Sequence, residues 1–222
     1  MKLAHYDFET VFEITAESVN VLVVESENVF LRYAAELFGQ TNGLPGNFCL
    51  SEKDEPLSFS KYAFFVNDYL SFQVNDKKIV QKLYQSLQNI VDEKLYFEYE
   101  ELRRRFSDFF QLLNAESDIP MEYEDDGALL AILKSFNVKI EESPSFLENL
   151  IAYVRLLSVF TKVKCFFFMN LKTVLTAEQL LAFYKEMQLN EIRVFLLENT
   201  LKEKLPPENI LVIDRDLCEI VV

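Results

Sequence analysis

Residue types on which catalytic and metal sites depend are scarce in this chain of 222 residues. There is one histidine, His5, and the three cysteines (Cys49, Cys165 and Cys218) lie far apart. A Ser/His/Asp or Cys/His catalytic set, or a zinc site, needs more of these residues than the chain holds. An odd number of scattered cysteines indicates free thiols. Such a catalytic set and a zinc site are therefore disfavoured, and we expect His5 to have a structural role.

Glycine is scarce as well, and its distribution disfavours a phosphate-binding loop. Three of the four glycines, Gly39, Gly43 and Gly46, lie in one stretch that contains no GKS, GKT or GxGxxG sequence. Nucleotide-binding loops need such glycines beside a helix amino terminus. The stretch is more typical of a helix end followed by turns. An ATPase or a dehydrogenase is therefore disfavoured.

Long apolar runs are missing too. Residues 1–10 carry acidic side chains and lack the apolar stretch of a signal peptide. The strongly apolar stretches, such as residues 163–169, are too short to span a bilayer. We expect a soluble protein of the cytoplasm with no membrane partner.

Basic residues are outnumbered, 22 Lys and Arg against 36 Asp and Glu, which gives a net charge of −14. Taken as an average, this charge disfavours nucleic acid, because affinity for a polyphosphate grows with the number of cations that displace counterions. Small basic groups nevertheless occur, among them Lys77 with Lys78 and Lys134 with Lys139. Each is typical of a solvated face, although a symmetric oligomer would gather several copies of one patch around a shared surface.

Strand-like and helix-like patterns alternate at both ends of the chain. A β-branched run at 19–24 precedes a helical pattern at 29–38, and a helical pattern at 176–189 begins with the capping pair Thr176 and Gln179. Further strands are predicted at 61–66, 163–169, 192–197, 210–213 and 217–222. The strands on either side of residues 176–189 complete a βαβ unit with a parallel crossover. We predict an α/β head made of residues 1–76 and 161–222.

The middle of the chain is predicted to be a helical leg over residues 77–160. Apolar residues recur every three to four positions from 79 to 113, which indicates one long helix or two joined helices. Further amphipathic helices are predicted at 128–136 and 146–160, after a break at 119–127 that we interpret as a hinge. Aromatic residues of the leg suit either a helical core or a subunit interface.

The hinge is strongly acidic. Glu122, Glu124, Asp125 and Asp126 fall within five residues, and Glu141 follows at the next helix junction. Crowded carboxylates suit a hard cation such as Ca²⁺, although their spacing is not that of an EF-hand. The same residues also suit a solvated loop or the amino terminus of the following helix. The residues alone do not decide between a cation site and a solvated loop or helix start.

Five segments, in order along nearly the whole chain, carry a resemblance to a known family. The sequence resembles the CRISPR-associated type II-A adaptation proteins, in their short form. The segments are Val21-Leu-Val-Val-Glu25 with Val29-Phe30, Phe72-Gln-Val-Asn-Asp-Lys-Lys-Ile79 with Lys82-Leu-Tyr84, residues 130–142 (LAILKSFNVKIEE), Phe166-Phe-Phe-Met-Asn170 with Leu175-Thr176, and residues 212–220 (VIDRDLCEI). Residues 39–55 have no counterpart in this comparison.

The resemblance implies a ring-shaped homotetramer without catalytic activity. Each subunit would have an α/β head with a mainly parallel sheet, similar to P-loop ATPases but without a working nucleotide site, and an inserted helical leg. The ring would be stabilised by Ca²⁺ and would bind double-stranded DNA at its ends, without sequence preference, during spacer acquisition. The CRISPR integrase and the type II effector nuclease are the implied protein partners.

The resemblance also implies site residues. The acidic segment of the family corresponds to Glu122, Glu124, Asp125, Asp126 and Glu141, which become the expected Ca²⁺ ligands. Lysines in the matching segments, Lys77, Lys78, Lys134 and Lys139, become candidates for DNA contacts. The alternative is an acidic scaffold that recruits the integrase or the effector nuclease and touches DNA only weakly. An ATP-driven clamp would need phosphate-loop chemistry that the sequence lacks.

Overall fold

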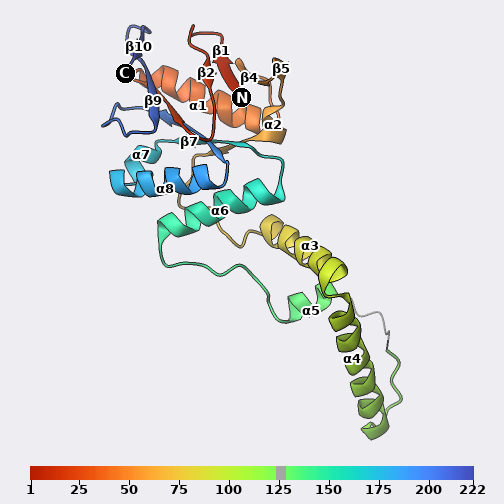
Figure 1. Ribbon diagram of the computed structural model, residues 1–222. Helices are drawn as coiled ribbons and strands as arrows, with labels where there is room; N and C mark the ends of the chain where they lie inside the picture. Colours follow the sequence, from red (N-terminus) through yellow and green to blue (C-terminus); the bar gives the residue numbers. More distant parts are fainter. Residues whose placement is uncertain (124–128) are drawn as a thin grey trace. The chain divides into compact units, whose positions relative to one another are not determined.

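The computed structural model describes residues 1–123 and 129–222 (Figure 1). The chain divides into two compact units. The α/β unit combines Met1–Gln73 with Glu142–Val222, and the helical unit is Val74–Glu141. Within the described residues, no helix is long and apolar enough to cross a membrane.

Among the described residues, six strands form the main sheet of the α/β unit, in the order β10-β9-β3-β8-β7-β6. The strands are β3 (Val19–Val24), β6 (Ala63–Val66), β7 (Cys165–Met169), β8 (Arg193–Glu198), β9 (Glu208–Ile213) and β10 (Glu219–Val221). Neighbours from β9 through β3, β8 and β7 to β6 run parallel, whereas β10 pairs antiparallel with β9. The prediction of an α/β fold with a mainly parallel sheet is confirmed.

The sheet is buried on both faces, which is why its strands are continuous apolar runs. All six residues of β3 are buried. Because successive side chains of a strand point to opposite faces, Val21 and Val23 pack in one hydrophobic cluster while Leu22 and Val24 pack in the other. Both faces of the sheet therefore need helical cover.

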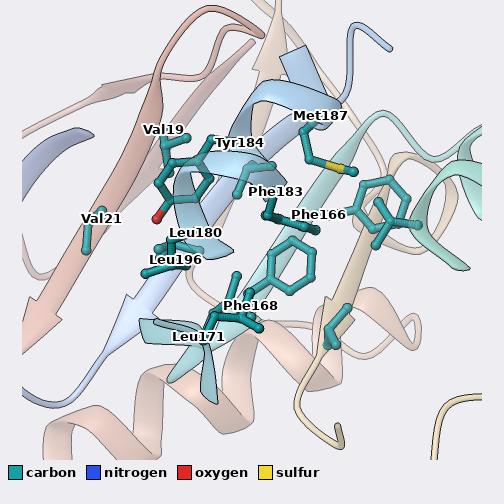
Figure 2. Packing of buried hydrophobic residues seen from close by; sticks show 14 of the residues in the cluster. Val19, Val21, Phe166, Phe168, Leu171, Leu180, Phe183, Tyr184, Met187 and Leu196 are labelled. Carbon is teal, nitrogen blue, oxygen red and sulfur yellow. The ribbon is translucent and has the colours of Figure 1, made fainter. Parts of the chain in front are cut away.

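Helices from both ends of the chain supply that cover. On one face, α1 (Glu27–Thr41) buries Tyr33, Ala34 and Leu37. The other face packs against α6 (Phe146–Phe160) and α8 (Ala177–Leu189). Figure 2 shows this second packing, with Phe166, Phe168 and Leu196 of the sheet beside Leu180, Phe183 and Tyr184 of α8. Two short helices, α2 (Phe59–Tyr62) and α7 (Leu171–Val174), complete the unit.

The position of α6 differs from the predicted domain limits. The predicted leg extends to residue 160, whereas the compact helical unit ends at Glu141 and α6 lies in the α/β unit. Leu150 and Val154 of α6 are fully buried in the cluster that covers the sheet. Periodicity identified this helix with its bounds, but an amphipathic pattern does not reveal which partner its apolar face covers.

Sequence patterns missed a small antiparallel sheet in the described part of the α/β unit. It has the order β2-β1-β4-β5, with β1 (Lys2–His5), β2 (Phe12–Glu13), β4 (Phe48–Glu52) and β5 (Glu55–Pro56). His5 is buried here against the rings of Phe8 and Phe48. Its Nδ1 accepts a hydrogen bond from the Asp7 N–H, and its Nε2 lies 2.9 Å from a Glu36 carboxylate oxygen. These contacts fit the expected structural role.

The glycine-rich stretch is a helix end followed by turns, as predicted. Helix α1 ends at Thr41, and Gly43 follows with a φ of 88°, which favours glycine. At Gly46 a Cβ atom would lie 2.6 Å from Oε1 of Gln40. That Gln40 amide bonds both the N–H and the carbonyl oxygen of Phe48, so it cannot move aside without losing two hydrogen bonds.

The helical unit contains α3 (Lys77–Lys94), α4 (Tyr96–Glu116) and α5 (Leu129–Ser135). The long apolar pattern therefore forms two joined helices, with Leu95 ending α3 and starting α4. Val74, Ile79 and Leu129 are the buried apolar residues near the start of α3 and α5. Helix α4 has no buried residue within the described part of the unit.

Candidate functional site

Lys77 and Lys78 form the first two residues of α3, and both are exposed. Asp76 caps the helix, because its carboxylate accepts a hydrogen bond of 2.8 Å from the Lys78 N–H. Lysines at a helix amino terminus add positive charge to the positive end of the helix dipole, which is unfavourable for the isolated helix. The arrangement gives this end of α3 a positive potential that suits an anionic partner.

Lys134 and Lys139 lie on either side of the turn that ends α5. Lys134 is in the last turn of the helix, and Asn137 follows in the left-handed conformation with a φ of 49°. The Val138 N–H then bonds the Leu133 carbonyl oxygen at 3.0 Å, the pattern that closes many helices. Asparagine tolerates this conformation better than most residues. The turn directs residues 138–141 back beside α3 (Figure 1).

Two side chains of the α3 segment hold this returning segment in place. The Asn75 amide bonds the Ile140 backbone twice: its Nδ2 donates to the carbonyl oxygen at 2.9 Å, and its Oδ1 accepts from the N–H at 2.8 Å. The Tyr84 hydroxyl donates to the Val138 carbonyl oxygen at 2.9 Å. Lys139 lies between these two fixed residues. The structure therefore brings Lys139 to the segment that carries Lys77 and Lys78.

This region is positive in a chain that is negative overall. Residues 74–91 and 129–141 carry five lysines and only two carboxylates, Asp76 and Glu141. We call the exposed lysines Lys77, Lys78, Lys82, Lys134 and Lys139 the lysine surface. Lys82 follows Lys78 by four residues, so it lies on the same side of α3. Lys82 lies in one of the segments that carry the family resemblance but is not among the predicted DNA contacts.

Two of the five expected Ca²⁺ ligands lie in the described part of the chain. Glu122 and Glu141 are both exposed, and Glu141 follows the residue that Asn75 holds. Glu124, Asp125 and Asp126 fall outside the described residues. Within residues 1–123 and 129–222, no group of three or more His, Cys, Asp or Glu side chains is placed to hold a metal ion. The five carboxylates supply oxygen ligands, which are the kind that Ca²⁺ prefers.

A second polar region lies at the carboxyl end of the parallel strands. Strand β3 ends at Val24, and after Glu25 and Ser26 the helix α1 begins at Glu27. A crevice of about 490 Å³ is lined here by Glu25, Glu27, Asn199, Thr200 and Arg215, with Val24, Phe30 and Leu201. This edge is where open α/β sheets bind ligands. The two carboxylates at the start of α1 would repel a phosphate group.

Residues 40–217 match the family model Cas_Csn2, described as CRISPR-associated protein. No curated protein matches the chain. The family match covers most of the chain and spans the lysine surface, the acidic segment and most of the main sheet. The chain therefore belongs to the Cas_Csn2 family of CRISPR-associated proteins, the type II-A adaptation family that its sequence resembles.

Proposed function

We propose that this protein is a ring-shaped homotetramer, stabilised by Ca²⁺ and without catalytic activity, that binds ends of double-stranded DNA and slides on it in the cytoplasm during spacer acquisition. Membership of the family assigns the chain to CRISPR adaptation. The observation that carries the DNA contact is the lysine surface, five exposed lysines on α3, on α5 and in the segment held by Asn75.

Binding through such a surface is independent of base sequence. Lysine ammonium groups contact phosphates, which position a duplex without reading its bases. Each phosphate contact releases counterions, so affinity falls as salt rises. A whole-chain charge of −14 opposes this binding in a monomer. A ring would place four copies of the lysine surface around one hole and leave much of the acidic excess outside.

The exposed apolar face of α4 supports assembly from identical subunits. Phe97, Phe109 and Leu112 are 83%, 57% and 67% exposed. Large aromatic and aliphatic side chains gathered on one helix are typical of protein interfaces. A second copy of the chain is the partner that we propose for this face, because a symmetric assembly buries the same apolar face in every subunit.

Ca²⁺ would be held by Glu122, Glu124, Asp125, Asp126 and Glu141. When bound, it would neutralise carboxylates that otherwise repel one another and would tie the acidic segment to the segment after α5. Glu141 follows Ile140, whose backbone is fixed to Asn75. A metal held through Glu141 would thus be anchored to the start of α3.

The head of each subunit is proposed to resemble P-loop ATPases without binding a nucleotide. A phosphate loop needs several residues, with glycines, between strand and helix. Here Glu25 and Ser26 alone join β3 to α1, and Glu27 starts the helix. Two carboxylates at the helix amino terminus oppose a phosphate group electrostatically. The implied partners of the ring are the CRISPR integrase and the type II effector nuclease.

A DNA-binding assay with lysine variants tests the proposed DNA contact. Lys77, Lys78 and Lys139 are changed together to Ala, and Lys185→Ala on α8 serves as the control because Lys185 is exposed and lies in the other unit. The triple variant should lose most of its affinity for linear duplex and show a weaker salt dependence. Unchanged affinity with unchanged recruitment of the integrase would favour the scaffold alternative.

Sedimentation in Ca²⁺ and in chelator tests assembly and metal together. In Ca²⁺ the mass should correspond to four chains of 26.0 kDa. Chelation should shift the mass or the sedimentation coefficient. A variant with Glu122 and Glu141 changed to Gln should resemble the chelated protein. A mass of one chain in Ca²⁺ would contradict the ring.

A further inference from the structure

Asn75 connects segments that lie 65 residues apart in the sequence. Its side chain donates one hydrogen bond to the Ile140 backbone and accepts another from it. A carboxylate or a hydroxyl of similar size offers a different set of donors and acceptors, and an apolar residue offers none. An amide at this position therefore matches an extended backbone as a neighbouring strand would.

The hydrogen bond from Tyr84 to Val138 holds the same segment on the other side of Lys139. Val138 and Ile140 are half-buried, whereas Lys139 between them is exposed. This alternation is that of an extended segment with one face against α3 and the other in solvent. The hydrogen bonds at the two flanking residues thus leave the Lys139 side chain on the solvent side of the segment.

We propose that Asn75 is a positioning residue for DNA binding: by fixing Ile140 it holds Lys139 beside Lys77 and Lys78, so that the three ammonium groups act as one phosphate-binding surface. The inference rests on the proposed function. Lys77 is two residues from Asn75, and Lys139 is one residue from Ile140, so the double hydrogen bond sets the distance between them. Groups held in place before binding lose less conformational entropy when they bind.

The test measures binding of the full-length protein to a short linear duplex over a series of salt concentrations, at saturating Ca²⁺. The variants are Asn75→Ala, Lys139→Ala and the two combined. Asn89→Ala is the control, because Asn89 is an exposed asparagine on α3, the helix that follows Asn75. We expect Asn75→Ala to weaken binding several-fold and to lower the salt slope as Lys139→Ala does, by about 0.9 for each phosphate contact that the assembly loses.

The combined variant distinguishes positioning from an unrelated structural effect. If Asn75 acts through Lys139, the affinity of the combined variant for the duplex equals that of the single variant with the lower affinity. The positioning role is overturned if the loss of affinity in the combined variant equals the product of the losses in the two single variants. It is also overturned if Asn75→Ala has the affinity and the salt slope of the wild-type protein. Tyr84→Phe, which keeps the ring and removes one hydrogen bond, carries the same test if Asn75→Ala does not fold.

The failure of the inference and that of the proposed function give different results. If the wild-type protein does not bind linear duplex, the proposed function fails and the inference fails with it. If wild type binds, Lys139→Ala weakens binding and Asn75→Ala does not, only the positioning role fails.

Discussion

Lys172 and Glu208 form an ion pair in the interior of the α/β unit. The Lys172 Nζ donates to a Glu208 carboxylate oxygen at 2.7 Å and to the Glu203 carbonyl oxygen at 2.8 Å. The Tyr184 hydroxyl donates to the other Glu208 oxygen at 2.8 Å. Burial and the adjacent Glu208 carboxylate raise the pKa of Tyr184, so this hydroxyl remains a donor. The cluster fixes the loop between β8 and β9 to α7 and α8.

Replacing Lys172 by Met should therefore destabilise the protein strongly. The change leaves the Glu208 carboxylate buried with no opposite charge, which costs about 3–5 kcal/mol of unfolding free energy. Denaturant unfolding at matched protein concentration measures the loss. Lys185→Met on the exposed side of α8 is the control and should change the free energy by less than about 0.5 kcal/mol. An equal effect of both substitutions would contradict the described burial of the pair.

Glu198, at the end of β8, is also buried, and burial raises the pKa of its carboxyl group from 4.5 to about 7. The Lys172 N–H and the charges of Lys172 and Lys202 oppose this shift only in part. Between these two pKa values the folded state binds more protons than the unfolded state. The contribution of Glu198 to stability is therefore lost as pH rises through this range.

Glu198→Gln should accordingly stabilise the protein in a pH-dependent manner. Glutamine stays neutral, so the variant avoids the cost of a buried charge at pH 8, on the order of 3 kcal/mol. At pH 5 the wild-type carboxyl group is largely protonated, and the two proteins should differ little. Urea midpoints at both pH values measure this. A difference that is the same at pH 5 and pH 8 would show that Glu198 does not titrate in this range.

At the scale of elements, the starts of α8 and α1 differ although both have a hydroxyl residue at the N-cap. The Thr176 hydroxyl accepts from the Gln179 N–H at 3.3 Å, and the Gln179 side chain accepts from the Thr176 N–H at 3.0 Å. Ser26 caps α1 without a side-chain cap hydrogen bond among the described residues. The reciprocal pair at the start of α8 is the one that the sequence predicts, because Gln follows Thr by three residues.

Thr176→Ala should cost about 1 kcal/mol of unfolding free energy, because an N–H at the start of α8 loses its partner. Ser26→Ala provides the comparison and should be close to neutral. Thermal or denaturant unfolding of the two variants measures the difference. If Ser26→Ala proves the more costly change, the assignment of the caps is wrong.

Elements were predictable from sequence where burial imposes a regular pattern. The continuous apolar runs of β3 and β7 follow from burial on both faces of the sheet. The apolar residues of α6 recur at helical spacing because only one side of that helix is buried. The small sheet of β1, β2, β4 and β5 was missed because strands of two to five residues show little alternation. The lysines could be named from the sequence, but their arrangement could not. The bonds from Asn75 and Tyr84 to a distant backbone follow no spacing rule, and only the structure places them.

For the molecule as a whole, the distribution of charge reconciles the negative net charge with the proposed DNA binding. The lysine surface is positive within a chain of charge −14, and part of the acidic excess lies in the segment proposed to bind Ca²⁺. A ring would turn this uneven distribution into a positive hole. Such a ring can take up a duplex only over an end unless its subunits separate.

Binding to linear and to covalently closed circular DNA of one sequence tests whether the protein is a ring that loads at DNA ends. In Ca²⁺ a ring should bind strongly to the linear duplex and little to the closed circle, and the linear complex should be lost when a chelator is added. Blocking both ends of the linear duplex with bulky groups should trap bound rings and exclude free ones. Equal binding to closed circles, or no binding to linear DNA at low salt, would contradict a ring that loads at DNA ends.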